Sequence, residues 1–207
     1  MSEALLGLHQ EVRGCQLCAL SRTRTQAVPG DGDPTAQIMI VGEAPGQNED
    51  QQGLPFVGAA GQMLNQLLSG IGIERKDVYI TNIVKCRPPG NRDPLPEEVS
   101  ACSGYLDRQV EYIRPAVILL LGRHALQRLL PGSPGISRVH GQMVQRGDRA
   151  YVPLYHPAAA LYNNFLLDTL RQDFARVRDY IAEIEAKRAA AAPAVTDTDP
   201  KEQLSLF

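Results

Sequence analysis

The segment with the most obvious capacity for chemistry is VGEAPGQNEDQQGLPFVG, residues 41–58. It follows an apolar run and places three carboxylates, Glu43, Glu49 and Asp50, beside a turn stiffened by glycine and proline. Phe56 adds a single aromatic ring on the far side of that turn. A loop that merely connects two elements seldom needs a stiff backbone, several acids and an aromatic ring at once. The segment is therefore a candidate part of a functional site.

Two other polar residues stand in unusual places. Asn82 lies inside the apolar run VYITNIV, where a side-chain amide is either satisfied by the backbone or meets a ligand, two readings of equal weight. His156 follows the run AYVPLY and precedes Pro157, a setting in which histidine is more often structural than functional. Residue type alone does not decide the role of either side chain.

The four cysteines form a second candidate site. Cys15 and Cys18 make a C-x-x-C pair, whereas Cys86 and Cys102 lie far downstream. Four cysteines without a fifth indicate one tetrathiolate site for zinc or a [4Fe–4S] cluster, and the spacing does not choose between the two metals. Such a site would connect the N-terminal segment to the rest of the fold. The alternative is four separate buried thiols.

The elements that must position these residues follow from the apolar pattern. Short runs rich in β-branched and aliphatic residues predict strands, and apolar residues at helical spacing predict helices. The strands are expected at 37–41, 78–84, 116–121 and 150–155, and the helices at 59–71, 96–113, 124–130 and from 163 to about 190. This alternation predicts an α/β fold with three layers, α/β/α, around a central four-stranded parallel sheet.

In a parallel sheet of this kind, ligands bind at the carboxyl ends of the strands. Three of the unusual segments follow or end predicted strands: GEAPG, residues 82–87, and residues 155–157. We therefore expect them to converge in space, although they are far apart in the chain.

Length and composition bound the rest. The 207 residues suffice for one α/β domain, expected over residues 1–188, and a flexible, disordered tail over residues 189–207. The formal net charge of −2 points to no nucleic-acid or membrane partner by itself. Neither a signal peptide nor an apolar span is evident, so a cytoplasmic protein with reduced thiols is expected, without a membrane partner. Nothing in the sequence indicates oligomers, so a monomer is expected.

Arginines gather in one part of the sequence. Between residues 122 and 149 they outnumber the acids by five to one, which predicts either a local basic face or a solvated loop. These arginines are Arg123, Arg128, Arg138, Arg146 and Arg149.

Taken in order, the motifs GEAPGQNED, GLPFVGAAG, TNIVKCRPPGNRDP and YHPAAAL, together with the four cysteines, resemble the family-4 uracil-DNA glycosylases. The resemblance extends from about residue 13 to about residue 180. It implies a [4Fe–4S] cluster on Cys15, Cys18, Cys86 and Cys102, and excision of uracil from double-stranded and also single-stranded DNA. The bacterial cytoplasm, near the nucleoid, is the expected location.

The resemblance also assigns roles in base recognition. A base excised from DNA must leave the stack and enter a pocket that reads its edge and stacks on its face. Phe56 would stack on uracil, the Asn82 amide would pair with O4 and N3–H, and His156 would donate to O2 as negative charge develops there. The backbone of the GEAPG turn would form one wall of the pocket through Gly42, Glu43, Ala44, Pro45 and Gly46.

The acids would act on the sugar and the attacking water. Glu43 is expected beside the base, Glu49 is the preferred candidate for water activation, and Asp50 ranks third. Asn91, in the GNRDP loop, is a further candidate for positioning the water. We expect no lysine in these motifs to act as a Schiff-base nucleophile, so the reaction should be hydrolysis that leaves an abasic site without strand cleavage.

The chain departs from the family pattern at the DNA-facing positions. Leu54 and Tyr162 stand where arginines are common, so Arg123 and Arg138 are candidates for holding the DNA backbone instead. Leu161 and Tyr162 could act as a wedge that fills the vacated stack. Ala44 offers only a methyl group where a bulkier side chain blocks the C5-methyl of thymine in other relatives, so rejection of thymine is an open question.

The C-terminal pentapeptide QLSLF resembles a bacterial sliding-clamp-binding motif, with Gln203, Leu204, Leu206 and Phe207 as the contacts. The alternative is a terminus that folds back onto the domain. Two rival functions also remain at this point: a protein of the same fold that traps uracil-DNA covalently, and a zinc-containing nucleotide-binding or clamp-associated protein without catalysis. The absence of histidine between Cys86 and Cys102 counts against covalent trapping.

Overall fold

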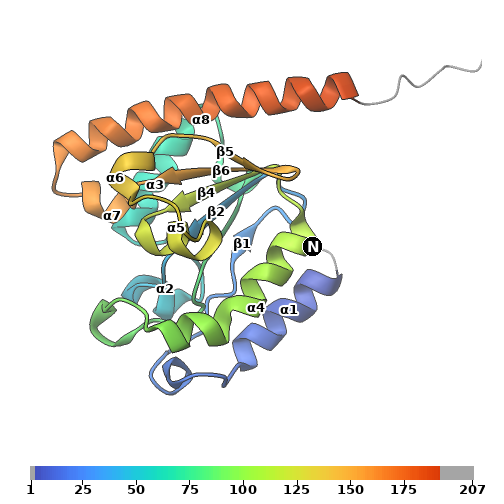
Figure 1. Cartoon of the computed structure of the whole chain (residues 1–207). Helices are drawn as coiled ribbons and strands as arrows, with labels where there is room; N and C mark the ends of the chain where they lie inside the picture. Colours follow the sequence, from blue (N-terminus) through green and yellow to red (C-terminus); the bar gives the residue numbers. More distant parts are fainter. Residues whose placement is uncertain (1–2, 192–207) are drawn as a thin grey trace, which may run out of the picture.

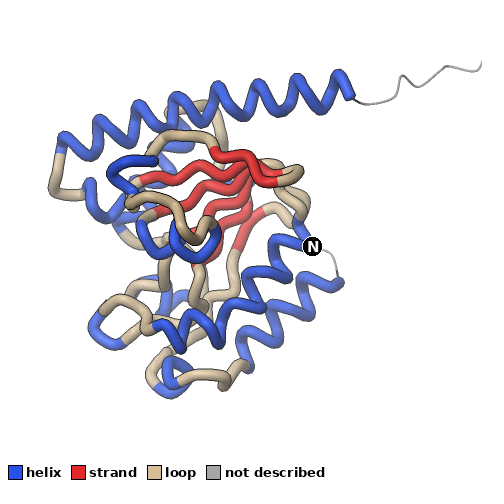
Figure 2. The backbone as a smooth tube through the Cα atoms, in the orientation of Figure 1, coloured by secondary structure: helices blue, strands red, loops and turns tan. Residues whose placement is uncertain are grey.

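A mixed β-sheet lies at the centre of the computed structural model, which describes residues 3–191 (Figures 1 and 2). The strand order is β1-β3-β2-β4-β6-β5. The four inner strands, β3 (Tyr79–Asn82), β2 (Ile38–Gly42), β4 (Val117–Leu121) and β6 (Arg149–Leu154), run parallel to one another. The prediction of a four-stranded parallel core is therefore confirmed.

The sheet also has two antiparallel edge strands that the sequence did not reveal. Strand β1 (Asp31–Gly32) pairs with β3, and strand β5 (Val144–Arg146) pairs with β6. Strand β1 has two residues and β5 is mostly exposed, so neither carries the apolar pattern on which strand prediction depends. The sheet is mixed for this reason, and the expected strand count of four is corrected to six within residues 3–191.

Helices cover both faces of the sheet, as Figure 1 shows. The first half of the chain contributes α1 (Glu3–Gly14), α2 (Gln47–Gln52) and α3 (Ala59–Ser69), with the 3₁₀ turns η1 (Ala19–Arg22) and η2 (Arg75–Asp77). The second half contributes η3 (Pro89–Asn91), α4 (Pro96–Ile113), α5 (Arg123–Leu129), α6 (Ile136–Val139), α7 (Pro157–Ala160) and α8 (Asn164–Ala191). The four predicted helices correspond to α3, α4, α5 and α8, and their predicted ends lie within two residues of the observed ones.

Alternating residues of the inner strands feed two separate apolar layers. In β2, Ile38 and Ile40 face the layer that contains α3 and α8, whereas Met39 and Val41 face the layer that contains α1, α4 and α5. All four side chains are buried, and each contributes about 1.5–3 kcal/mol to folding. This two-sided burial explains why the strand reads as an unbroken apolar run, and it confirms the three-layer architecture.

The carboxyl ends of the parallel strands meet at one edge of the sheet. Gly42, the last residue of β2, is the register partner of Asn82, the last residue of β3. Strand β6 ends at Leu154, two residues before His156. The sheet therefore brings together the three segments that were expected to converge, because parallel strands place their final residues side by side.

Within residues 3–191, none of the helices is both long enough and apolar enough to cross a membrane. Helix α8 continues to Ala191, three residues beyond the expected domain boundary at residue 188. The QLSLF pentapeptide and most of the predicted tail lie outside the described residues.

Candidate active site

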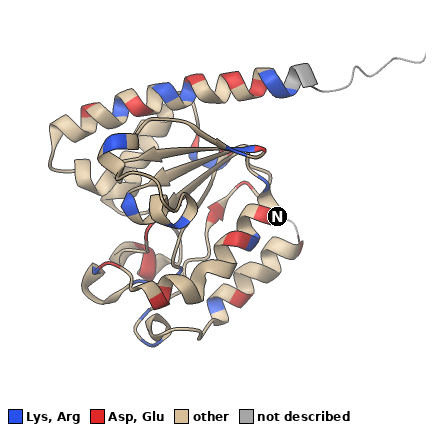
Figure 3. Cartoon of the chain, in the orientation of Figure 1, with Lys and Arg blue, Asp and Glu red and all other residues tan. Residues whose placement is uncertain are grey.

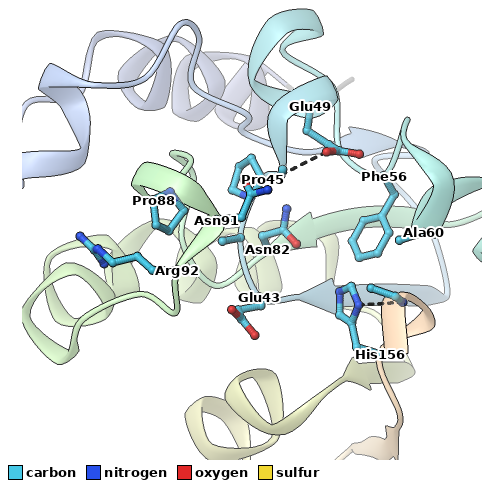
Figure 4. A pocket seen from close by; sticks show the side chains of 13 residues that line it. Glu43, Pro45, Glu49, Phe56, Ala60, Asn82, Pro88, Asn91, Arg92 and His156 are labelled. Atoms are coloured by element: carbon cyan, nitrogen blue, oxygen red, sulfur yellow. Dashed lines mark hydrogen bonds between the residues drawn. The ribbon is translucent and has the colours of Figure 1, made fainter. Parts of the chain in front are cut away.

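A cavity of about 300 Å³ opens at the carboxyl ends of the strands (Figure 4). This volume is at the small end of the range for ligand pockets. It is lined by Glu43, Ala44, Pro45, Gly46, Glu49, Phe56, Ala60, Asn82, Pro88, Asn91, Arg92, His156 and Ala158. Most of the predicted pocket residues are among them. Gly42 is not, because it lies behind the Asn82 amide and the Phe56 ring rather than on the cavity surface.

Asn82 presents an unsatisfied polar atom to this cavity. Its side chain is 1 % exposed, and its Oδ1 has no hydrogen-bond partner within the described part of the chain. Gly42 makes this position possible, since a Cβ on Gly42 would lie 2.4 Å from Asn82 Oδ1. A buried acceptor without a partner costs about 1–3 kcal/mol, so its retention in a pocket points to a ligand that donates a hydrogen bond.

A buried lysine fixes the backbone of Asn82. The Nζ of Lys85 donates to the Asn82 carbonyl at 2.6 Å, to Thr81 Oγ1 at 2.6 Å and to Gln109 Oε1 at 2.7 Å. Burial lowers the pKa of Lys85 to about 7. Lys85 lies within the TNIVKC motif and is the one lysine of the quoted motifs that could act as a Schiff-base nucleophile. However, all three contacts point its amine into the protein core, and Lys85 does not line the cavity.

Phe56 forms the opposite side of the cavity from a strained backbone. Its φ of 51° lies in the left-handed region, which costs a bulky residue roughly 1–2 kcal/mol. Its ring stacks on that of His156 with centroids 5.6 Å apart and an interplanar angle of 29°. Gly42 accommodates the ring, because a Cβ there would lie 2.6 Å from Phe56 Cζ. The strain and the glycine together place an aromatic face at the cavity wall.

His156 is held in a single tautomer. Its Nδ1 accepts a hydrogen bond from the backbone N–H of Ala158 at 3.2 Å, at the start of α7. Because a backbone N–H cannot accept, the neutral imidazole must carry its hydrogen on Nε2. Burial lowers the pKa of His156 to about 4, against the smaller opposing effect of the Glu49 charge. The ring is therefore neutral near pH 7 and presents Nε2–H as a hydrogen-bond donor.

Glu43 and Glu49 both line the cavity but differ in their surroundings. Burial raises the pKa of Glu43, and the negative charge of Asp93 adds to that effect. The His124 ring, which is charged only when protonated, lies close by, with Nε2 3.8 Å from Glu43 Oε2. Within residues 3–191 the Glu43 carboxylate accepts no hydrogen bond. It is a poorly solvated base with free lone pairs.

The Glu49 carboxylate is instead tied to the backbone. Its Oε1 accepts from the N–H groups of Val57 at 2.9 Å and Gly58 at 2.8 Å, and its Oε2 accepts from Gly46 at 3.1 Å. These bonds cap helix α2 and attach it to the segment that carries Phe56. The side chain expected to activate water is thus also a structural brace.

Two other predicted candidates occupy different settings. Asp50 is buried outside the cavity, where both carboxylate oxygens accept from the N–H of Thr25 at 2.9 and 3.1 Å. The hydrogen bonds from Thr25 account for the acidic residue at position 50, so Asp50 needs no role in the pocket. Asn91 lines the cavity with a φ of 55°, and its Oδ1 accepts from Arg87 Nε at 2.7 Å. Its amide nitrogen is left for another partner.

Comparison with known proteins bears directly on this cavity. Residues 29–182 match the model of the uracil DNA glycosylase superfamily. A type-4 uracil-DNA glycosylase from Sulfurisphaera tokodaii is 47% identical over 186 residues, covering 86% of this chain and 84% of its own length. One from Archaeoglobus fulgidus is 48% identical over 183 residues, covering 84% and 92%.

The chain belongs to the type-4 uracil-DNA glycosylase family. A type-5 enzyme from Pyrobaculum aerophilum is less similar, with 36% identity over 149 residues that cover 63% of this chain and 65% of its own length. The family resemblance stated from the motifs is confirmed.

In this family member, the thiols of all four cysteines are free and surround one small cavity beside the apolar cluster of Val12, Leu20 and Ala27. Within residues 3–191, no three of the sulfur atoms lie within 4.8 Å of one another. A single zinc ion with Zn–S bonds of about 2.3 Å would hold its sulfurs closer than that. A cubane cluster binds its thiolates through four separate irons and spreads them farther apart.

Hydrogen-bond donors already point at three of the sulfurs. Arg24 Nη1 lies 3.0 Å from Cys86 Sγ, the N–H of Lys85 lies 3.3 Å from Cys102 Sγ, and the N–H of Leu17 lies 3.5 Å from Cys15 Sγ. Such N–H···S bonds stabilise thiolate ligands and tune clusters. The donor set therefore fits the iron–sulfur group that the resemblance implies, and it disfavours four unrelated thiols.

The predicted DNA-contacting residues are dispersed around the pocket. Tyr162 is 98 % exposed and Phe165 is 79 % exposed, just after α7, whereas Leu161 is partly buried. Phe165 was not among the predicted residues, although an aromatic residue directly after Asn163 and Asn164 was a signal that could have found it.

The arginines of residues 122–149 do not form one basic face. Arg123 pairs with Asp93 near the carboxyl ends of the strands, and Arg128 pairs with Asp107. Arg146 and Arg149 lie on the β5–β6 hairpin at the amino end of β6, the opposite end of the sheet (Figure 3). Arg138 is exposed on α6. Figure 3 also shows acidic and basic residues alternating along α8. The basic-face prediction is therefore wrong as a single surface.

Proposed function

We propose that this chain excises uracil from DNA by hydrolysing the N-glycosidic bond of a base flipped into the cavity, leaving an abasic site. The observation that carries the proposal is the unpaired, buried Oδ1 of Asn82 at the cavity wall. Uracil offers N3–H as a donor next to O4 as an acceptor, which is the complement of a side-chain amide. Cytosine offers an acceptor and a donor in those places, so the same amide rejects it.

The two rings of the cavity supply the remaining recognition. Phe56 provides the stacking face, and its fixed backbone keeps the ring in place before the base arrives. His156 donates Nε2–H to uracil O2, where negative charge accumulates as the glycosidic bond breaks. Because the His156 imidazole is already neutral, it stabilises the negative charge on uracil O2 as a hydrogen-bond donor and needs no prior deprotonation. Preplaced donors of this kind act on the transition state.

Glu43 is the favoured group for the cationic sugar and the attacking water. Its carboxylate accepts no hydrogen bond within residues 3–191, and its raised pKa makes it a better proton acceptor than an ordinary glutamate. Asn91 is placed to orient the water through its amide nitrogen. Glu49, the first choice from sequence, keeps one lone pair of Oε2 for a water molecule while bracing the wall. Lys85 faces away from the cavity, which supports hydrolysis without a Schiff base.

The DNA is proposed to lie across the mouth of the cavity. Leu161 and Tyr162 serve as the wedge that occupies the vacated stack, and Phe165 extends this aromatic surface. Arg123 and Arg138 contact phosphates as single cations, since the arginines of residues 122–149 do not form one basic face. Because this protein surface is aromatic and carries few fixed cations, both single-stranded and double-stranded DNA are proposed substrates.

We further propose that the four cysteines hold a [4Fe–4S] cluster. The spread of the sulfurs and their N–H donors support iron over zinc. When bound, the cluster supplies a covalent staple that links the segment after α1 to the start of α4 and the end of β3. Iron and sulfide content of the purified protein, with absorbance near 400 nm, tests this assignment, and a zinc content of one per chain would refute it.

The terminal QLSLF is proposed to deliver a monomeric enzyme to the sliding clamp on bacterial DNA, in the cytoplasm. The support is the sequence of residues 203–207 alone. Deletion of these residues should abolish clamp binding and leave excision from short oligonucleotides intact. Unchanged affinity for the clamp would end this proposal.

One assay tests the central function. The protein is incubated with single-stranded and duplex oligonucleotides that contain one uracil, and alkali then cleaves any abasic site. We expect cleavage after alkali and none before it, with matched cytosine and thymine oligonucleotides left intact. Absence of cleavage would contradict the proposal, and a protein–DNA adduct stable to denaturant would instead favour covalent trapping. Cleavage of the thymine oligonucleotide would show that Ala44 leaves room for the C5-methyl group.

A further inference from the structure

Arg75 lies on η2, outside the cavity, and its guanidinium binds the segment that carries Phe56. Its Nη2 donates to the carbonyl of Pro55 at 2.6 Å, and its Nη1 donates to the carbonyl of Phe56 at 3.1 Å. A third contact joins Nη1 to Asn65 Oδ1 at 3.3 Å, on helix α3. Within residues 3–191 no carboxylate lies within 4 Å of this cation. The half-buried, positively charged guanidinium of Arg75 therefore binds mainly two backbone carbonyls.

The same segment is held from its other side. Glu49 accepts from the N–H groups of Val57 and Gly58, the two residues that follow Phe56. A cation thus binds the carbonyls and an anion binds the N–H groups of one four-residue segment, 55–58. Charge-assisted hydrogen bonds are about twice as strong as neutral ones, so this pair of contacts forms a two-sided clamp on the backbone.

A clamp is needed because the backbone it holds is strained. Phe56 has a φ of 51°, which a bulky side chain leaves readily unless its surroundings hold it. Gly61 leaves room for this conformation, since a Cβ at residue 61 would lie 1.8 Å from the Phe56 carbonyl oxygen. Without the clamp, relaxation of φ would swing the ring away from its place beside His156 and change the cavity wall.

We propose that Arg75 is a positioning residue that fixes the Phe56 ring in its stacking position before the base enters. The inference rests on the proposed function, in which Phe56 stacks on uracil, and assigns the preorganisation of that surface to a residue that touches no substrate. Loss of Arg75 removes two donors to the strained segment. The Phe56 ring then samples other positions, and part of the free energy of substrate binding is used to return it to the stacking position.

A double-mutant cycle tests this role. Single-turnover excision and substrate affinity are measured on a uracil oligonucleotide for the wild type, Arg75→Ala, Phe56→Ala and the double variant. We expect Arg75→Ala to lower the excision rate by about 10- to 100-fold. In the Phe56→Ala background the same change should have little further effect, because the ring that it positions is absent. Additive losses would overturn the proposal and assign Arg75 a general structural role.

Two more variants complete the design. Arg75→Lys keeps a cation that reaches one carbonyl, so it should recover part of the lost rate. Arg108→Ala removes an arginine that also makes two charge-assisted hydrogen bonds, to Glu11, but that does not contact the cavity lining, and it should excise uracil at the wild-type rate. Wild-type activity in Arg75→Ala would also refute the proposal. If that variant does not fold, the cycle is run with Arg75→Lys and judged by the same criterion. An inactive wild type would refute the proposed function itself, a separate outcome.

Discussion

The two sides of the cavity use their polar atoms in different ways. On the side formed by α2 and residues 55–58, which we call the framework wall, Glu49 accepts from three backbone N–H groups and the neighbouring carbonyls accept from Arg75. On the side formed by the ends of β2, β3 and β6, the recognition wall, Asn82 Oδ1 has no partner within the described chain and the Glu43 carboxylate accepts no hydrogen bond there. His156 there presents a free Nε2–H.

This difference shows where rigidity and where chemistry reside. Satisfied polar groups make a wall stiff, because moving them would break several hydrogen bonds at once. Unsatisfied groups are costly in the free protein and gain their partners only when a ligand arrives. The framework wall therefore fixes the shape of the cavity, and the recognition wall reads and transforms what enters it. Substitutions on the two walls should separate stability from activity.

The largest effect is expected at Asn82. Asn82→Asp replaces the donor to uracil O4 with a buried carboxylate that has no cationic partner, so excision should fall by roughly 10³-fold or more. Single-turnover assays on uracil and cytosine oligonucleotides measure the loss and any gained acceptance of cytosine. Gln145→Glu is the matched control, since it makes the same change from amide to carboxylate at an exposed residue of β5, at the opposite end of the sheet. Near-normal excision by Asn82→Asp would show that the Asn82 amide does not recognise the base.

The next effect is expected at Glu43. Glu43→Gln keeps the shape but removes the anion and the base, so excision should fall by about 10²- to 10⁴-fold. Burial raises the pKa of Glu43, so ionising it costs the folded state stability as pH rises above its unfolded pKa. The variant should consequently unfold at the same or a higher temperature at pH 7. A loss of activity accompanied by a clearly lower unfolding temperature would place Glu43 on the framework wall instead.

The pH profile sharpens the same comparison. Excision should increase with pH through the pKa of Glu43, which lies above the ordinary glutamate value, and then reach a plateau. His156 should not contribute to this limb above pH 5, because its pKa of about 4 keeps it neutral. In Glu43→Gln the acid limb should disappear. Persistence of the limb would assign it to another group.

Glu49→Gln should show the opposite balance. A neutral amide cannot accept from three N–H groups as a carboxylate does and directs its own NH₂ at some of them, so stability should fall by about 1–3 kcal/mol. Excision should fall on the order of 10-fold, through a loosened wall. Thermal unfolding and single-turnover rates, compared with Glu43→Gln, measure both. If Glu49→Gln loses as much activity as Glu43→Gln with no loss of stability, Glu49 is the water-activating base that the sequence first indicated.

The smallest effect is expected outside both walls. Tyr162→Ala should slow excision from duplex DNA a few-fold, because the wedge assists flipping without touching the reacting bond. Leu6→Ala is the control, since it shortens an exposed apolar side chain on α1, away from the cavity. An equal slowing by both variants would deny Tyr162 a role in holding the opened stack.

The sequence predicted those parts of the fold that bury apolar side chains in a regular pattern. The inner strands and helices α3, α4, α5 and α8 carry such patterns. Strands β1 and β5 do not, and α2 arises from polar residues whose helix is capped by Glu49. Helix α1 was not predicted, although its buried apolar residues Leu5 and Leu8 stand at helical spacing. Polar segments such as β1, β5 and α2 lack the regular spacing of apolar residues from which strands and helices are predicted.

By itself, the sequence determined the family, the order of the elements and most of the residues that line the cavity. These follow from motifs and from residue types whose chemistry is local. Only the tertiary structure decided which acid accepts backbone hydrogen bonds and which accepts none, that Lys85 points into the core, and that Arg75 holds Phe56. These roles depend on hydrogen bonds between residues up to 24 positions apart in the chain. The packing of the sheet and helices chooses such partners, and no local pattern records them.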